Sequence, residues 1–151
     1  MWDNFKAMPK LLKFFTAHAI ACVVFFFGSV IPHGAFSIDG HRVTYHEWWG
    51  SGAGIYTAMI GILLPLGGWF MLKRSYYARS YYLGTLVVGL IFPYLLLKHF
   101  RESDSSYGLA AIGTAAVAAV AWYLYGKETV RDYFSSNKAL KEDAAKGRRA
   151  P

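Results

Sequence analysis

Four long apolar stretches, each of 18 to 21 residues, dominate this sequence. They run over residues 11–31, 52–72, 80–97 and 107–125, and none has a charged residue near its middle. An α-helix rises about 1.5 Å per residue, so each stretch is long enough to cross roughly 30 Å of bilayer hydrocarbon. A soluble bundle would need polar residues at helical spacing, which the stretches lack. The sequence therefore predicts an all-α membrane protein built as a four-transmembrane-helix bundle.

Composition agrees with this class and leaves no room for a second folded unit. Charged residues make up 17% of the 151-residue chain, whereas soluble domains carry about 25%. We expect a transmembrane domain over residues 1–126 and a basic cytoplasmic tail over 127–151. The tail is small and charged from Ser135 onward, so we expect it to be partly disordered.

The distribution of basic residues predicts the orientation of the four spans. Cytoplasmic segments are enriched in Lys and Arg. The N-terminal arm, the loop between the second and third spans, and the tail together carry 13 of them, whereas the other two loops carry three. Both ends are therefore expected in the cytoplasm (N-in/C-in). The net charge is +7, and the Lys and Arg residues lie beside the apolar stretches and in the tail. We therefore expect anionic lipid headgroups as partners and no nucleic acid.

The loop between the first two spans, expected on the outer side, has the most specific local pattern. Apolar and polar residues alternate around Asp39-Gly40, a strong signal for a β-hairpin. Thr44 and Glu47 then match a capping box, which predicts that a helix begins near Tyr45 and continues into the second span. Two interpretations of this structured loop remain open, a docking edge for another protein or a plug over the bundle. Its candidate partner-binding residues are Phe36, Arg42, Tyr45, Trp48 and Trp49.

Helix packing in the membrane is expected to use small residues, which let backbones approach closely. The fourth span has such residues at a spacing of four, in two rows that we expect to form one surface together with Gly113. The rows are Ala110, Thr114, Ala118 and Ala111, Ala115, Ala119. Pro65 and Pro93 are expected either to belong to an ordinary bundle or to open a hinge or cavity.

The sequence gives little support for catalysis. No phosphate loop, nucleophile elbow or HExxH motif is present, and no span holds an Asp or Glu to carry protons. Four histidines expected on the outer side are candidate metal ligands, although their spacing matches no ligand motif: His33, His41, His46 and His99. His18 is the intramembrane polar candidate, either facing the bundle interior as a functional group or neutral beside a neighbouring helix or the headgroups.

We therefore expect no enzyme and no cofactor. The leading hypothesis is a small multi-pass protein of the bacterial inner membrane that acts through protein contacts. It would be an accessory or protective, immunity-like subunit of an envelope system, partnered by another membrane or envelope protein and compatible with a homo-oligomer. The alternative is a small transporter or a redox or metal-binding module that uses His18 or the outer histidines.

Overall fold

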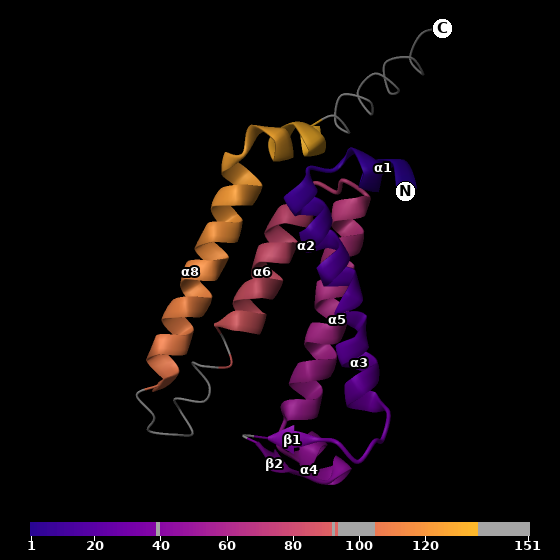
Figure 1. The fold of residues 1–151 in the computed structure, drawn as a ribbon, viewed down its shortest axis with the longest axis vertical. Coiled ribbons are helices and arrows are strands. Elements are labelled where there is room, and N and C mark those ends of the chain that lie inside the picture. The colour runs from indigo at the N-terminus through magenta and orange to yellow at the C-terminus, as the bar shows by residue number, and fades with distance from the viewer. Residues whose placement is uncertain (39, 92, 94–104, 136–151) are drawn as a thin grey trace, which may run out of the picture.

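The computed structural model describes residues 1–38, 40–91, 93 and 105–135 of the chain, and they are mostly helical (Figure 1). A short helix over residues 128–135, here called the tail helix, follows the last labelled element. In chain order the elements are α1 (Trp2–Ala7), α2 (Lys10–Ala21), α3 (Val23–Val30), β1 (Ser37–Ile38), β2 (His41–Arg42), α4 (Tyr45–Gly50), α5 (Ala53–Leu72), α6 (Ala78–Leu90) and α8 (Ser105–Gly126).

Three helical segments are long and apolar enough to cross a membrane: Lys10–Val30, Ala53–Leu72 and Gly108–Gly126. They match the first, second and fourth predicted spans to within a few residues. The first consists of α2 and α3, which are separated by a turn at Cys22. The third predicted span, 80–97, is helical over its part of α6, and residues 92 and 94–97 lie outside the described part of the chain.

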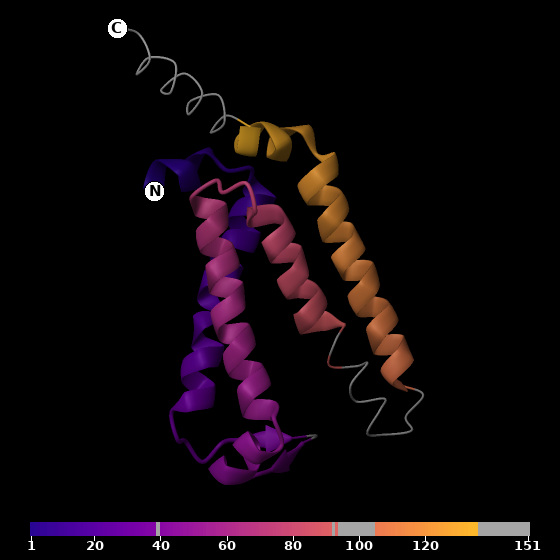
Figure 2. The ribbon, with the colours of Figure 1, turned by 180° about the vertical axis from the view of Figure 1, so that it is seen from behind.

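The long helices pack in the order in which they follow one another along the chain. α2 and α3 lie against α5, α5 lies against α6, and α6 lies against α8. Both views show α8 on the far side of α6 from α3, and its end near residue 108 lies well away from α5 (Figures 1 and 2). α8 is therefore an outer element of the bundle, with α6 as its main neighbour.

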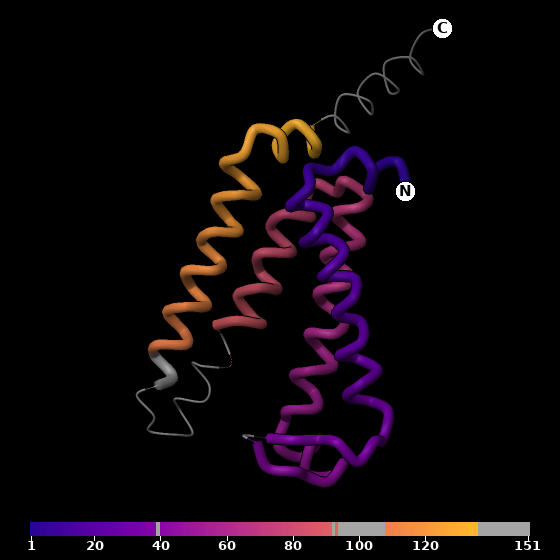
Figure 3. Tube along the Cα trace, viewed as in Figure 1, coloured from indigo at the N-terminus to yellow at the C-terminus, as the bar shows by residue number. Residues whose placement is uncertain are grey.

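The two ends of the bundle differ in charge. One end holds α1, the loop between α5 and α6, and the tail helix (Figure 3). Its described cations are Lys6, Lys10, Lys13, Lys73, Arg74, Arg79, Lys127 and Arg131. The other end holds the hairpin and α4, and Arg42 is its only Lys or Arg among the described residues. We call these the basic end and the cap end.

The buried core lies mainly toward the basic end. Leu12, Met71 and Leu124, from three different helices, are fully buried there. The tail helix joins this core through Val130 and Tyr133, which are also buried. The apolar residues of the tail helix therefore cover this end of the bundle.

The local predictions for the loop are confirmed, except at its junction with the second span. β1 and β2 pair antiparallel, with Ser37 opposite Arg42. Thr44 and Glu47 form a complete capping box. The helix that begins at Tyr45 does not continue into the span, because Gly52 has a φ of +82° and separates α4 from α5. Glycine adopts this left-handed conformation at no steric cost, so the chain turns between the two helices.

Candidate functional site

An aromatic cluster organises the cap end, whose hairpin and α4 we together call the cap. The ring of Phe36 stacks on His33 at a centroid distance of 4.3 Å and on Trp48 at 5.3 Å. Tyr45 lies 5.6 Å from Phe36 and 6.2 Å from Trp49. Four of the five predicted partner-binding residues are thus in contact with one another. Phe36 is only 4% exposed, so its side chain holds the cap together and is not accessible to a partner.

Two hydrogen bonds attach this cluster to the end of α3. The hydroxyl of Tyr45 donates to the carbonyl of Val30 (3.0 Å), and His33 Nε2 donates to the carbonyl of Gly28 (2.7 Å). The carbonyls of a last helical turn have no partner within the helix, and such bonds satisfy them. The cap is therefore fastened to the first span as well as to α5.

Trp48 and Trp49 lie over the first turn of α5. A Cβ atom built on Gly54 would be 2.8 Å from Trp48 Cδ1 and 3.0 Å from Trp49 Cδ2. The two indoles can therefore pack this closely on α5 because position 54 has no side chain. The Nε1 atoms of both indoles are buried and have no hydrogen-bond partner among the described residues. The rings thus act here mainly through apolar packing, and Arg42 and Tyr45 are the exposed members of the predicted set.

Hydrogen bonding within the capping box also stabilises the ionised form of Glu47. Its carboxylate accepts from the backbone N–H of Thr44 (2.8 Å) and from the Thr44 hydroxyl (2.9 Å). These hydrogen bonds stabilise the ionised form and hold the pKa of Glu47 below its ordinary value. The capping box is therefore strongest when this carboxylate is ionised.

The candidate metal ligands do not converge in the part of the chain that is described. His33 is engaged by the carbonyl of Gly28, while His41 lies on β2 and His46 on α4. Among the described residues there is no group of three or more His, Cys, Asp or Glu side chains able to hold a metal ion. His99 lies outside the described residues.

His18 does not face the bundle interior. Its side chain is exposed on the surface of α2, where it stacks on Phe14 at a centroid distance of 6.1 Å. Its Nε2 lies 3.8 Å from the sulfur of Cys22, one turn along the chain. The structure thus places this imidazole on the outer surface of the first span, against residues of that same span.

α8 presents an unusual exposed face. Only 11% of this span is buried, against 22% for Lys10–Val30 and 28% for Ala53–Leu72. Exposed Ala111, Ala115 and Ala118 follow one another at spacings of four and three, so they lie on one side of the helix, with exposed Trp122 next in line. We call these four residues the α8 small-residue face.

The opposite side of α8 packs on α6, and Gly113 belongs to that side. A Cβ atom on Gly113 would be 2.5 Å from the carbonyl oxygen of Leu90, so the two helices touch at this glycine. Leu124, three turns along, is fully buried on the same side. The prediction that Gly113 shares one surface with both alanine rows is therefore wrong, because Gly113 is buried against α6 whereas Ala111, Ala115 and Ala118 are exposed.

Arginine–aromatic contacts hold the basic end together. The guanidinium of Arg74 lies 4.4 Å from the centre of the Tyr133 ring, and the Tyr133 hydroxyl donates to the carbonyl of Met71 (3.2 Å). Burial raises the pKa of Tyr133, and Arg74 opposes part of that rise. Arg79 lies 4.7 Å from the centre of the Tyr125 ring and donates to the carbonyl of Leu124. These contacts fasten the tail helix to the loop after α5 and the end of α8 to the first turn of α6.

Comparison with protein-family models, with curated proteins and with solved structures finds no match to this chain. The functional argument therefore rests on the chain's own geometry. That geometry adds two features that the sequence analysis missed. Asn4 Nδ2 of α1 donates to the carbonyl of Leu72 (3.0 Å), so α1 is docked on α5, and the tail helix packs on the core. A signal for α1 was present, because Trp2 and Phe5 are three residues apart and so share one side of a helix.

Proposed function

We propose that this protein is a four-span, N-in/C-in protein of the bacterial inner membrane that acts through protein contacts. In this proposal it is an accessory or protective subunit of an envelope system, and the α8 small-residue face is where it contacts another membrane protein. The excess of Lys and Arg at the basic end supports the orientation. The exposed face of α8 is the observation that carries the functional proposal.

The physical argument concerns what a span normally shows to lipid. Association of helices in a bilayer depends on close backbone approach, so small residues are enriched where helices meet. The outward residues of α3 are large, with Val24, Phe25 and Phe27 between 47% and 61% exposed. On α8 the exposed residues include a row of three alanines, beside the large side chains of Ile112 (68% exposed) and Trp122 (66%). A row of alanines facing outward is typical of a helix whose partner belongs to another polypeptide.

The hydroxyl of Thr114, on the exposed side of α8, does not need a partner outside the helix. It donates to the carbonyl of Ala110 one turn earlier (2.8 Å), so it is satisfied within α8. The surface formed by Thr114 and the exposed alanines of α8 therefore has no unsatisfied side-chain hydroxyl. A neighbouring helix can approach such a surface closely without leaving a polar group unpaired.

The test is co-purification in mild detergent from native membranes, with wild-type protein and two double variants. Ala111→Leu with Ala115→Leu places branched side chains on the small-residue face. Overpacking of this kind costs about 1–3 kcal/mol, so recovery of the partner should fall at least about fivefold. Ala17→Leu with Ala21→Leu makes the same change on exposed positions of α2 and should leave the partner bound.

A stoichiometric membrane protein that is lost only with the α8 variant would support the proposal. Equal recovery of the partner with both variants, or wild-type protein that purifies alone, would refute it. The protective form of the proposal has its own readout. Cells with and without the gene would be challenged with pore-forming toxins, and the α8 variant should lose any protection that the wild type gives.

A further inference from the structure

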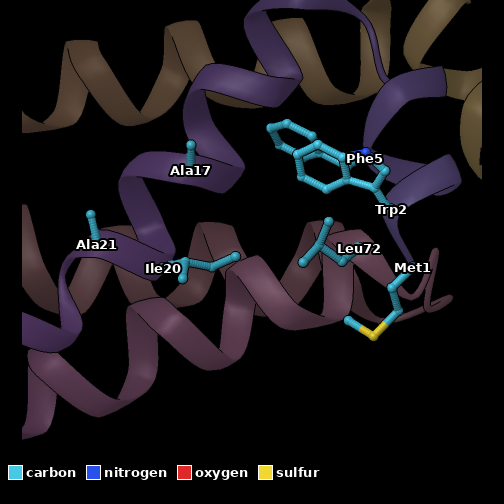
Figure 4. A pocket seen from close by; sticks show the side chains of 7 residues that line it. All are labelled: Met1, Trp2, Phe5, Ala17, Ile20, Ala21 and Leu72. Carbon is cyan, nitrogen blue, oxygen red and sulfur yellow. The ribbon is translucent and has the colours of Figure 1, made fainter.

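An apolar groove lies at the basic end, between α1, α2 and the last turn of α5 (Figure 4). Trp2 and Phe5 of α1 form one end together with Leu72, Ala17 and Ala21 of α2 form the other, and Ile20 lies between them. Its volume is about 400 Å³. Ligand pockets in proteins measure about 300–1,000 Å³, so the groove is large enough to hold part of a small molecule.

A second groove continues along the same pair of helices toward the middle of the bundle. It is lined by Val23 of α3 and by Gly61, Pro65 and Trp69 of α5, and its volume is about 360 Å³. Along α5, positions 62, 65, 69 and 72 follow at spacings of three or four, so both grooves lie on one side of that helix. We call the two grooves together the seam.

The seam faces away from α6. Gly67 lies on the other side of α5, where a Cβ atom would be 3.2 Å from the ring of Tyr82 in α6. Gly68, between the two sides, lies against Thr16 and Ala19 of α2. The first span and α5 are thus pressed together along their contact, and the seam is the open furrow beside it.

The length of the seam corresponds to one leaflet. Leu72 and Gly61 are eleven residues apart in a continuous helix, which at 1.5 Å per residue is about 16 Å. Half of a hydrocarbon core of roughly 30 Å is about 15 Å. The furrow therefore runs from the headgroup level at the basic end to about the middle of the bilayer.

Two ammonium groups lie beside the seam at the basic end. Lys6 Nζ is 5.9 Å from the centre of the Trp2 ring, and Lys73 Nζ is 4.8 Å from the centre of the Trp69 ring. Each of these rings lines one of the two grooves. Asp3, also on α1, is the one nearby carboxylate in that helix, so the rim as a whole is positive. An anionic group is the complementary ligand.

The position of α1 favours a lipid chain over another helix. Asn4 Nδ2 donates to the carbonyl of Leu72 (3.0 Å), so α1 is fastened across the last turn of α5. A transmembrane helix lying in the seam would have to continue past α1. An acyl chain ends at this level and turns into its headgroup.

We propose that the seam is a binding site for an anionic phospholipid of the surrounding bilayer. One acyl chain lies along the furrow between the first span and α5, and the phosphate lies at the basic end beside Lys6 and Lys73. The site holds this lipid more tightly than the remaining apolar surface holds the lipids around it. The proposal does not depend on the function assigned to α8.

The experiment is native mass spectrometry after reconstitution with equal amounts of phosphatidylglycerol and phosphatidylcholine that have the same acyl chains. Wild-type protein should retain one phosphatidylglycerol through detergent exchange. Ala17→Leu with Ala21→Leu fills the furrow from exposed positions and should abolish this retention. Lys6→Gln and Lys73→Gln should each reduce the preference for phosphatidylglycerol about fivefold, the factor that one basic residue near an anionic surface supplies.

Matched controls come from α8. Ala111→Leu with Ala115→Leu makes the same double change outside the seam. Lys127→Gln removes an ammonium that lies 5.6 Å from the centre of the Trp122 ring, an arrangement like those of Lys6 and Lys73 but on α8. Both control proteins should retain the lipid as the wild type does.

Several results would overturn the proposal. They are wild-type protein that retains no lipid, a folded Ala17→Leu/Ala21→Leu variant that retains as much as the wild type, and equal retention of the two phospholipids. A co-purifying protein that is lost with the Ala17→Leu/Ala21→Leu variant would also overturn it, because the seam would then bind a helix. Far-UV circular dichroism of each variant establishes that it is folded.

Discussion

Replacing Gly61 with alanine tests how tightly the first span packs on α5. Gly61 is buried in the middle of α5, opposite Phe26 of α3. A Cβ atom at position 61 would lie 2.8 Å from the Cα of Phe26 and closer still to its backbone nitrogen. These are backbone atoms, so no side-chain rotation relieves the overlap.

The size of the effect follows from these distances. Ordinary van der Waals contact begins at about 3.4 Å, so the Phe26 backbone must move by at least about 0.6 Å to accept the methyl group. Such a movement also disturbs the contact of Gly68 with Thr16 and Ile20, two turns along the same pair of helices. Overpacking in a well-packed interior costs about 1–3 kcal/mol, and we expect Gly61→Ala to lower the free energy of unfolding by that amount.

The assay is reversible unfolding in mixed micelles of mild detergent and sodium dodecyl sulfate, followed by far-UV circular dichroism. Gly28→Ala is the matched control, because Gly28 lies in α3 and a Cβ atom there would have no heavy atom within 4 Å. That variant should stay within about 0.5 kcal/mol of the wild type. If Gly61→Ala were equally neutral, the close contact between the first span and α5 would be wrong.

Three further predictions concern the cap and the tail helix. Thr44→Ala removes the N-cap residue of α4 and should destabilise this helix by about 1 kcal/mol. Amide hydrogen exchange over residues 45–50 should become faster, and unchanged exchange would contradict the capping role. Hydrogen bonds lower the pKa of Glu47 in the folded state, so they stabilise α4 at pH values above the ordinary glutamate pKa of about 4.3. This contribution disappears as the pH falls through the lowered pKa. Glu47→Gln should therefore remove the pH dependence of α4 stability, and a pH dependence equal to that of the wild type would contradict this. Tyr133→Phe removes the hydrogen bond to the carbonyl of Met71, which costs about 1 kcal/mol, and should speed proteolysis within residues 128–135. An unchanged rate of proteolysis would mean that other contacts hold the tail helix.

Local chemistry made the cap predictable from the sequence. The Asp39-Gly40 pair and the Thr44/Glu47 spacing carry their structural meaning within a few residues, and the register of the hairpin and the capping box are both observed. The extent of three apolar segments was predictable for a similar reason, since length and hydropathy suffice. The end of α4 could not be predicted, because a glycine inside a helical pattern can either continue the helix or break it. Gly52 breaks it.

The rotation of each helix depends on contacts between distant residues, and there the sequence was a poor guide. The periodicity of α8 places Ala111 and Ala115 on one side, but only the contact of Gly113 with Leu90 shows which side faces the bundle. The outward position of His18 follows in the same way from the inward positions of Thr16 and Ala19, which lie against Gly68. The burial of Tyr133 requires Met71, 62 residues earlier, and no local pattern reveals such a pairing.

The most direct test of the proposed function is photo-crosslinking in native membranes. The photoreactive residue p-benzoylphenylalanine would replace Trp122, an aromatic side chain that is 66% exposed and continues the α8 small-residue face. The matched position is Trp69, 42% exposed and lining the seam on α5. We predict a discrete protein adduct from position 122 and lipid adducts from position 69. Lipid adducts alone from position 122 would contradict the claim that α8 contacts another protein.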